Sequence, residues 1–214
     1  TNGTLFAGGD NDIDSGETLA GIGDVNGDGL DDFIIGAKNG RGFHSYVVGH
    51  TYLIYGSSTG YAAQVELRPE WLNGTNGATF EGLTNTLAVG RSICAAGDVN
   101  GDGYADFLTG SHEAQPDGHQ GQGGVYLVYG SPVKTAALTT LSPAWADGVR
   151  GALLGGATNL SYLGLFLSAG DVNGDGYDDL LLSQTLEGTN HAVVVVGRSD
   201  LPAKLNLSAE WFDG

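Results

Sequence analysis

The seven residues Gly-Asp-Val-Asn-Gly-Asp-Gly at positions 23–29 recur unchanged at 97–103 and at 170–176. The two steps between the copies are 74 and 73 residues. After two more residues each copy is followed by an aspartate, so the full loop reads Asp-Val-Asn-Gly-Asp-Gly-x-x-Asp. Self-similarity at a long, nearly constant period indicates a protein built from copies of one structural unit.

The repeat extends well beyond this loop. A short apolar run follows each copy, then a variable stretch, a second apolar run and a tryptophan, at Trp71, Trp145 and Trp211. The segment after the first tryptophan, Asn-Gly-Ala-Thr-Phe-Glu-Gly at 76–82, matches Asn-Gly-Thr-Leu-Phe-Ala-Gly at 2–8. The apolar runs lie at 32–36 and 51–56, at 106–110 and 125–130, and at 179–183 and 192–197.

The chain is predicted to be a single propeller unit, residues 1–214, made of three repeats at about 1–74, 75–148 and 149–214. Each repeat holds roughly four short runs of β-branched or aromatic residues, and the 38 glycines of the chain suit the tight turns between them. We therefore expect an all-β fold, a β-propeller with three four-stranded blades per chain. A calcium β-roll is the alternative, but its nonapeptide repeats are absent.

Oxygen-bearing side chains alternate along the loop. Positions 1, 3 and 5 are Asp, Asn and Asp in every copy, and position 9 is Asp. Calcium prefers six to eight oxygen ligands, and alternate positions can turn three side-chain oxygens inward as the chain curls around an ion. Glycines at positions 4 and 6 permit the positive φ that such a curl requires. Position 7 is Leu or Tyr, a variation that makes sense if only its backbone carbonyl binds the ion.

The sequence therefore predicts three structural calcium ions per chain, with the aspartate at position 9 closing each shell. Position 8 is left out because the middle repeat has Ala105 there, and the valine at position 2 of every copy is expected to be an inward apolar anchor. The predicted ligands are Asp24, Asn26, Asp28, Leu30 and Asp32 in the first loop, Asp98, Asn100, Asp102, Tyr104 and Asp106 in the second, and Asp171, Asn173, Asp175, Tyr177 and Asp179 in the third.

Three alternatives to a calcium loop of this kind fit the sequence less well: an EF-hand, a magnesium site and a metal-free turn. An EF-hand loop closes with an acid at position 12, but that position holds Ile35, Thr109 or Leu182 here, and the flanks are strand-like. Magnesium demands a small octahedral shell that keeps several waters. Asp, Asn and Gly also form metal-free β-turns, although three carboxylates crowded into one turn would repel one another without a cation.

The units resemble FG-GAP repeats, the blades of the N-terminal β-propeller of integrin alpha subunits and of bacterial relatives. The loop, the run Asp-Phe-Ile-Ile-Gly-Ala at 32–37 and the run Gly-Val-Tyr-Leu-Val-Tyr-Gly at 124–130 carry this resemblance. It implies that calcium sits between the first and second strands of each blade, counted from the centre. It also implies that partners bind the opposite face, which is built in part from the strand 2–3 loops at 38–50, 112–123 and 184–191.

This chain keeps only part of the Phe-Gly and Gly-Ala-Pro signature of the family. The changed residues bear on how the blades pack, and none of them is a predicted metal ligand. The Phe-Gly pair corresponds to Ser15-Gly16, Val89-Gly90 and Leu163-Gly164, and the Gly-Ala-Pro triplet to Gly36-Ala37-Lys38, Gly110-Ser111-His112 and Ser183-Gln184-Thr185.

Charge excludes some classes of partner. The chain has 25 acidic residues against 8 lysines and arginines and a net charge of −17. Binding to nucleic acid depends on neutralising phosphates with positive charge, so we expect no nucleic-acid partner. No apolar run reaches the ~20 residues that span a membrane, so no membrane insertion is expected. Moderate-affinity calcium loops would suit an extracellular or cell-surface setting.

No feature of the sequence indicates an enzyme. The histidines do not recur at one place in all three repeats, and no nucleophile elbow, zinc-protease motif or P-loop is present. Cys94 aligns with Ala20, a small position expected to be buried. We expect a binding or adhesion module for a protein or glycan ligand. The alternatives are a non-catalytic propeller domain attached to a larger secreted enzyme, and a lectin, for which Phe43 and Tyr46 lack counterparts in the other repeats.

A homodimer is the expected assembly. Propellers usually have about four to eight blades, and three blades leave two sheet faces uncovered. The outer strand of each blade is expected after its tryptophan, as at 78–81 and 152–154, and residues 4–7 have the same pattern. Pairing of residues 4–7 with 193–196 of a second copy, head to tail, would close a six-bladed ring. The alternative is a longer propeller of which this sequence is a piece.

Overall fold

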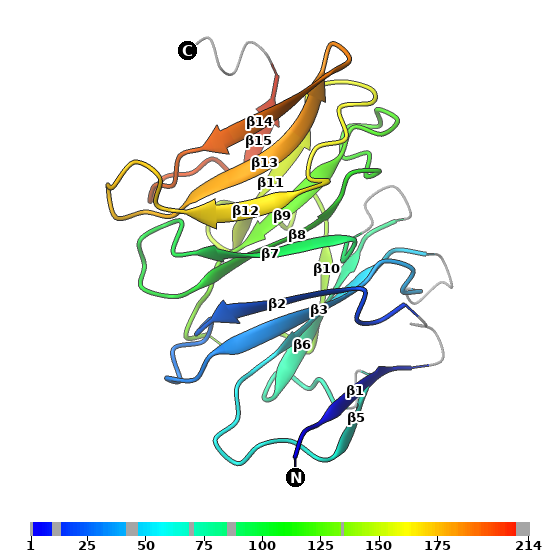
Figure 1. Ribbon diagram of the computed structural model, residues 1–214, viewed down its shortest axis with the longest axis vertical. Coiled ribbons are helices and arrows are strands. Elements are labelled where there is room, and N and C mark those ends of the chain that lie inside the picture. Colours follow the sequence, from blue (N-terminus) through cyan, green and yellow to red (C-terminus); the bar gives the residue numbers. More distant parts are fainter. Residues whose placement is uncertain are drawn as a thin grey trace.

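The computed structural model describes residues 2–9, 14–41, 47–68, 71–84, 89–133 and 135–208. Within these ranges the regular structure consists of strands alone, so the expected all-β class is confirmed. Figure 1 shows three sheets stacked in a fan, with strands β2, β7 and β12 at corresponding places in successive sheets. We call the three sheets blade 1, blade 2 and blade 3.

Blade 1 is formed mainly by the first repeat. Strands β2 (Thr18–Gly23), β3 (Asp32–Ala37), β4 (His50–Ile54) and β6 (Gly77–Gly82) pair antiparallel in that order. A fifth strand, β10 (Leu138–Leu141), lies parallel to β6 at the outer edge. Strand β6 follows the first tryptophan in the chain, which confirms the expected origin of the outer antiparallel strand.

Blade 2 repeats this arrangement one unit later. Strands β7 (Ser92–Gly97), β8 (Asp106–Ser111), β9 (Gly124–Val128) and β11 (Gly151–Gly156) pair antiparallel. Strand β15 (Lys204–Leu207) lies parallel to β11 and completes the sheet. Both complete sheets therefore contain strands from two successive repeats, which interlocks neighbouring units.

Two smaller sheets stand at the ends of the fan. Blade 3 contains β12 (Leu167–Gly170), β13 (Asp179–Leu186) and β14 (Thr189–Val195), and β14 pairs only with β13 within the described ranges. At the other end β1 (Leu5–Gly8) pairs parallel with β5 (Gln64–Leu67). Figure 1 shows this pair below blade 1, at the end of the molecule that carries the N-terminus.

The prediction of four-stranded blades is wrong in detail. Blades 1 and 2 each have five strands, and blade 3 has three among the residues that the structure describes. The additional strands β10 and β15 join the blade that precedes them in the chain, because their inward side chains, including Leu141, Leu205 and Leu207, are buried in the cores there. Strand β5 pairs parallel with β1 in the same way as β10 pairs with β6 and β15 with β11.

The cores lie between blades. The face of blade 1 that carries Ile34 and Leu53 packs against the face of blade 2 that carries Phe107 and Tyr126. Blade 2 packs in the same way on blade 3 through a second, mostly aliphatic core. We call the face turned toward the following blade the trailing face and the face turned toward the preceding blade the leading face.

The eroded family signature does not disturb this packing. Val89 and Leu163, which stand in place of phenylalanine, are fully buried. The glycine after each keeps a positive φ, 78° at Gly90 and 84° at Gly164. A Cβ at Gly90 would lie 2.0 Å from the His50 carbonyl oxygen of blade 1. The glycine is therefore the indispensable half of the pair at this joint, and any well-packed apolar residue can precede it.

Strand β1 has the position of an outer strand from a blade that would precede blade 1. Phe6 of β1 meets Phe33 edge-on, with ring centroids 5.4 Å apart and an interplanar angle of 75°. Phe80 of β6 meets Phe107 at 5.4 Å and 76°. The same aromatic pair therefore links β1 to blade 1 and β6 to blade 2.

The pairing of strand β10 with blade 1 can be tested with two leucines of that strand. Leu141 is fully buried in the core between blades 1 and 2, whereas Leu138 is 44% exposed. Leu141→Ala should lower the free energy of unfolding by roughly 2–5 kcal/mol, because it removes buried methyl groups and leaves a cavity. Leu138→Ala should change it by less than about 0.5 kcal/mol. Denaturant titration measures both, and equal effects would contradict the assignment of β10.

Candidate metal centre

The three repeated loops connect the two innermost strands of the blades. They join β2 to β3, β7 to β8 and β12 to β13, and so lie at the same end of all three blades. The strand 2–3 loops leave from the opposite end of β3, β8 and β13. The structure thus puts the predicted metal loops on one side of the molecule and the predicted binding loops on the other.

The aspartate at position 1 organises the curl of each loop. In the first loop Asp24 Oδ1 accepts hydrogen bonds from the backbone N–H groups of Gly27 and Asp28, at 2.7 and 3.1 Å, and Oδ2 accepts one from Gly29 at 2.8 Å. Asp171 accepts the equivalent three bonds in the third loop. The bond from Gly176 is the main reason that the pKa of Asp171 lies below its usual value.

The side chains at positions 3 and 5 meet. Asn26 Nδ2 donates to Asp28 Oδ2 at 3.1 Å, and Asn26 Oδ1 accepts from the Asp28 backbone N–H at 2.8 Å. The second and third loops have the same two bonds with lengths of 2.8–3.0 Å. The expected positive φ is confirmed at both glycine positions of all three loops, with values from 73° to 92°. The three loops therefore share one local conformation.

The aspartate at position 9 is a buried clamp. Asp106 Oδ2 accepts from the Val99 N–H at 2.9 Å, and Oδ1 accepts from the Gly130 N–H at 2.8 Å. These bonds tie the start of the loop to the end of strand β9. Asp32 and Asp179 make the same pair of bonds in their own blades. This role in holding the backbone was not foreseen from the sequence.

Burial makes the charged form of this clamp costly. Desolvation raises the pKa of Asp106 to about 8 and that of Asp32 to about 6, against the two backbone hydrogen bonds that favour the ionised carboxylate. The carboxylates at positions 1 and 5 of each loop raise these pKa values further by repulsion. A divalent cation beside the clamp would stabilise its ionised form.

Residues at positions 2, 7 and 8 connect neighbouring blades, and Val25 and Val99 at position 2 are buried in the interblade cores. Tyr104 lies against the loop of blade 1, where a Cβ at Gly27 would be 2.5 Å from its ring. The Ala105 N–H donates to the Asp24 carbonyl oxygen at 3.1 Å. Asp178 makes the same backbone bond to Asp98, and its Oδ2 accepts the Asp98 N–H at 2.8 Å. Differences in residue type at positions 7 and 8 therefore change the contacts between neighbouring blades.

The donor set of the loops suits a hard cation with oxygen ligands. Carboxylate and amide oxygens at positions 1, 3 and 5 belong to one tight curl, with the clamp carboxylate at its base. Among the described residues, however, no three His, Cys, Asp or Glu side chains are arranged as a ready metal cluster. In the first loop the carboxylate oxygens of Asp24 and Asp32 are instead occupied by hydrogen bonds from backbone N–H groups. The residues fit calcium chemically.

The cysteine Cys94, the histidine His112 and the aromatic residues Trp211, Phe43 and Tyr46 do not belong to the three loops. Cys94 lies half-buried in β7 against the core, and burial raises the pKa of its thiol. The ring of His112, at the start of the strand 2–3 loop of blade 2, lies beside that of Tyr162, with centroids 6.2 Å apart and an interplanar angle of 60°. Trp211, Phe43 and Tyr46 lie outside the described residues. No helix of the described chain is long and apolar enough to cross a membrane.

The clamp can be separated from the exposed loop acids by mutation in the absence of metal. An amide has one acceptor oxygen, so Asp106→Asn leaves the N–H of Val99 or Gly130 without its partner. In excess EDTA this substitution should lower the free energy of unfolding by roughly 1–3 kcal/mol. The matched control is Asp102→Asn, which keeps an acceptor for the exposed Tyr104 N–H and should have little effect. Thermal melts in EDTA compare them, and equal stability of the two variants would refute the clamp.

The comparison with known proteins agrees with the repeat structure. A family model of the FG-GAP repeat matches residues 15–54, 89–128 and 163–196, more than half of the chain. Integrin alpha-PS2 of Drosophila melanogaster is 35% identical over 165 residues, which cover 73% of this chain and 10% of that protein. Integrin alpha-5 of Xenopus laevis is 29% identical over 196 residues, covering 86% and 16%. The chain thus spans about a tenth to a sixth of the length of these curated relatives, and it belongs to the FG-GAP repeat family.

Proposed function

We propose that this chain is a calcium-binding β-propeller module of a secreted or cell-surface protein, with a role in adhesion. The observation that carries the proposal is the threefold loop, which has the same acids and the same place in every blade, and in which the aspartate at position 1 always accepts the N–H groups of positions 5 and 6. The similarity to integrin alpha subunits supports the extracellular setting and the adhesive role.

The proposed calcium is structural. An ion in the first loop would hold the β2–β3 connection, and the Asp24 and Val25 carbonyls of that loop already accept hydrogen bonds from Ala105 and Ser131 of blade 2. Each ion would therefore stiffen both its own hairpin and the surface on which the next blade packs. The whole set of predicted ligands named above would hold three ions.

We place ligand binding at the opposite end of the blades. The loop at 112–123 has a fixed internal framework there, because the fully buried Gln122 donates to the Gly156 carbonyl at 2.7 Å and to Asp117 Oδ2 at 3.0 Å. Gln122 Oε1 also accepts the Asp117 N–H. A loop held in this way presents its outer side chains with little loss of conformational entropy on binding. The proposed role is non-catalytic.

The calcium proposal predicts three ions per chain. Isothermal titration should find three sites at millimolar calcium or below, and Asp28→Ala, Asp102→Ala and Asp175→Ala should each remove about one. An ion present at 100 times its dissociation constant stabilises the fold by about 2.7 kcal/mol, so three would contribute roughly 8 kcal/mol. Excess EDTA should therefore lower the melting temperature sharply. Fewer than two sites, or an unchanged melt, would contradict a structural role for calcium.

The adhesive role predicts a protein ligand and not a glycan. The calcium-loaded chain should bind members of a panel of extracellular-matrix proteins and leave a glycan array blank in the same buffer. A variant with the exposed His119 and Gln120 both changed to alanine should lose binding, while its melting temperature stays close to that of the parent because Asp117 and Gln122 keep the loop framework. Binding confined to glycans would favour a lectin instead.

A further inference from the structure

We propose that the three loops form one coupled series, in which the residues at positions 7 and 8 of each loop hold the loop before it, so that calcium binds to them cooperatively. The proposal rests on the calcium-binding function proposed above and adds the contacts that couple the sites. Tyr177 and Asp178 of the third loop hold the second loop, and Tyr104 and Ala105 of the second loop hold the first. These are positioning residues for the neighbouring loop, and position 8 is not itself a predicted ligand.

The loops lie next to one another along one end of the stack. Figure 1 shows the β2–β3, β7–β8 and β12–β13 connections at the left of the view, in successive blades. The contacts from positions 7 and 8 run in one direction, from the third loop to the second and from the second to the first. Each of the first two loops is therefore held by the loop that follows it in the chain.

Asp178 holds the backbone of Asp98 by two hydrogen bonds. Its Oδ2 accepts the Asp98 N–H at 2.8 Å, and its own N–H donates to the Asp98 carbonyl oxygen at 3.1 Å. The side chain lies close against the start of the second loop, since a Cβ built on Gly97 would collide with the Asp178 carboxylate. Asp98 is the residue whose carboxylate accepts the N–H groups of Asp102 and Gly103, at 3.0 and 2.9 Å. The residue that curls the second loop is therefore fixed in place by the third.

The tyrosine at position 7 covers a glycine of the loop before it. A Cβ built on Gly101, at position 4 of the second loop, would lie 2.5 Å from the ring of Tyr177, and Tyr104 has the same relation to Gly27. Gly101 and Gly27 have φ values of 73° and 76°. The ring thus packs on a left-handed turn that has room for it only because glycine has no side chain. Positions 7 and 8 together contact the preceding loop at its positions 1 and 4.

Each positioning residue is held in turn by its own loop. The Tyr177 N–H donates to Asp175 Oδ1 at 3.0 Å, and the Tyr177 carbonyl is one of the predicted ligands. Asp178 lies between Tyr177 and the clamp Asp179, whose carboxylate accepts two backbone N–H groups of blade 3. A change in the curl of the third loop therefore moves the ring and the carboxylate that hold the second. Linkage then requires that each site changes the affinity of the other by the same factor.

Cover by the following loop also shields the predicted ligands from water. Asp98 and Asn100 of the second loop are half-buried. Asp171 and Asn173 of the third loop are exposed, and no atom lies within 4 Å of a Cβ built on Gly174. Attraction between charges is stronger where water is excluded. The contact between loops therefore acts on calcium affinity through the shape of the loop and through its surroundings.

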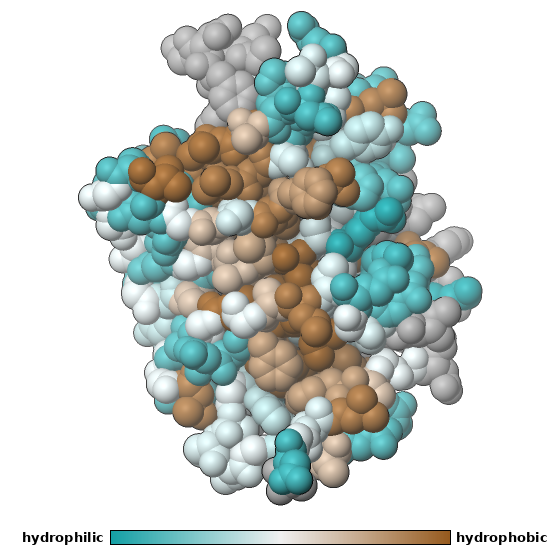
Figure 2. Space-filling model, in the orientation of Figure 1, coloured by the Kyte–Doolittle hydropathy of each residue, from teal (hydrophilic) through white to brown (hydrophobic). Residues whose placement is uncertain are grey.

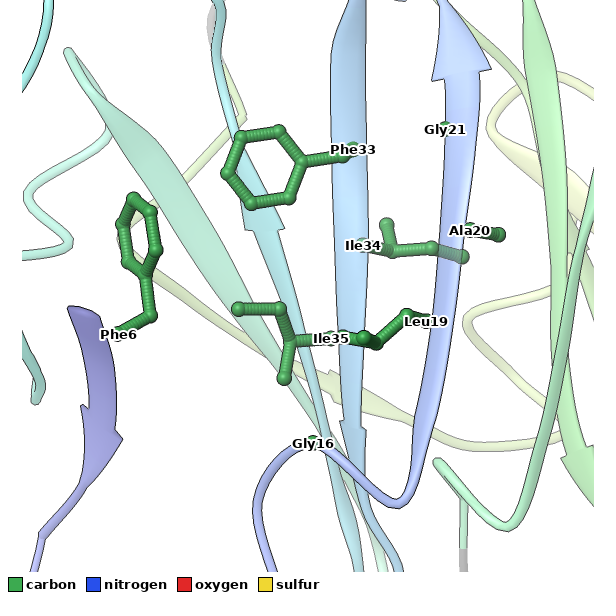
Figure 3. A pocket seen from close by; sticks show the side chains of 8 residues that line it. All are labelled: Phe6, Gly16, Leu19, Ala20, Gly21, Phe33, Ile34 and Ile35. Carbon is green, nitrogen blue, oxygen red and sulfur yellow. The ribbon is translucent and has the colours of Figure 1, made fainter. Parts of the chain in front are cut away.

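The apolar surfaces at the two ends of the fan are separate from these contacts. Figure 2 shows hydrophobic surface gathered at blade 3 and along the inner strands. At the other end a groove of about 430 Å³ is lined by Phe6, Leu19 and Phe33, and Figure 3 shows Phe6 turned toward Phe33 with open space beside Leu19. These surfaces belong to the trailing face of blade 3 and the leading face of blade 1. The coupling depends only on contacts within the two internal joints.

Amide hydrogen exchange of the 214-residue chain in excess EDTA tests the positioning without metal. Asp178→Ala should speed the exchange of the Asp102 and Gly103 N–H groups about fivefold, the factor that one net hydrogen bond supplies, because Asp98 loses its anchor. Asp178→Asn keeps an acceptor for the Asp98 N–H and should restore the slow exchange. The matched control, Asp31→Ala, makes the same change at the same position of the first loop, on the leading face of blade 1, and should leave these rates unchanged.

A calcium titration followed by NMR tests the cooperativity, because the amides of Gly103 and Gly176 report on the second and third loops separately. Asp175→Ala removes a predicted ligand of the third loop and should weaken calcium binding to the second loop about tenfold, within the usual range of coupling between sites. With Asp178→Ala already present, the same substitution should have a clearly smaller effect, as a double-mutant cycle measures.

Three results would overturn the proposal. They are unchanged exchange in Asp178→Ala, faster exchange throughout blade 2, which would mean a general loss of stability, and an affinity of the second loop that is independent of Asp175→Ala. A chain that binds no calcium would contradict the proposed function and with it cooperative binding. The exchange rates in EDTA would still decide whether Asp178 holds the second loop.

Discussion

A sheet that is apolar on both faces has to be covered on both faces, and this constraint governs the molecule. Strand β3 is buried at five of its six residues, and β8 is buried at all six. Neither strand has a polar side that could face water. Antiparallel sheets usually have one solvated face, but here blade 2 lies between blades 1 and 3, and blade 1 lies between blade 2 and the pair of β1 and β5. A single repeat would expose apolar area on both sides, so the unit is stable only as part of a stack.

The loops lie where this stack is joined. Their acids curl the backbone, and their clamp ties the hairpin to the third strand. Residues at positions 2, 7 and 8 contact the next or the preceding blade through side chains and backbone N–H groups. A change in the curl of one loop would therefore move the surface that supports a neighbouring tyrosine. If an ion fixes that curl, its stabilisation extends to the joint and is not limited to one turn of chain. Calcium affinity and interblade stability should be coupled for this reason.

The features that repeat locally were predictable from the sequence. The loop, the two apolar runs after it and the strand after the tryptophan all recur with the same spacing, and all are present in the structure. Strands β5, β10 and β15 were missed because each has only four residues and pairs with a strand of the preceding blade, so no local pattern announces them. The role of position 8 was missed because its contact with the neighbouring blade runs through the backbone N–H, as at Ala105, and no residue type marks such a contact.

The two joints show what a blade interface requires and what it leaves free. The joint between blades 1 and 2 contains aromatic pairs and a hydrogen bond of 2.6 Å between the Thr51 and Thr109 hydroxyls. The joint between blades 2 and 3 is aliphatic and has the Asp178 link. Both retain a positive-φ glycine at the start of the blade and the backbone bond from position 8 to position 1. Backbone geometry therefore sets how one blade follows another, while the side chains need only fill the space. A face with these backbone features and an uncovered apolar surface, as blade 3 has, is therefore complementary to any blade of this type.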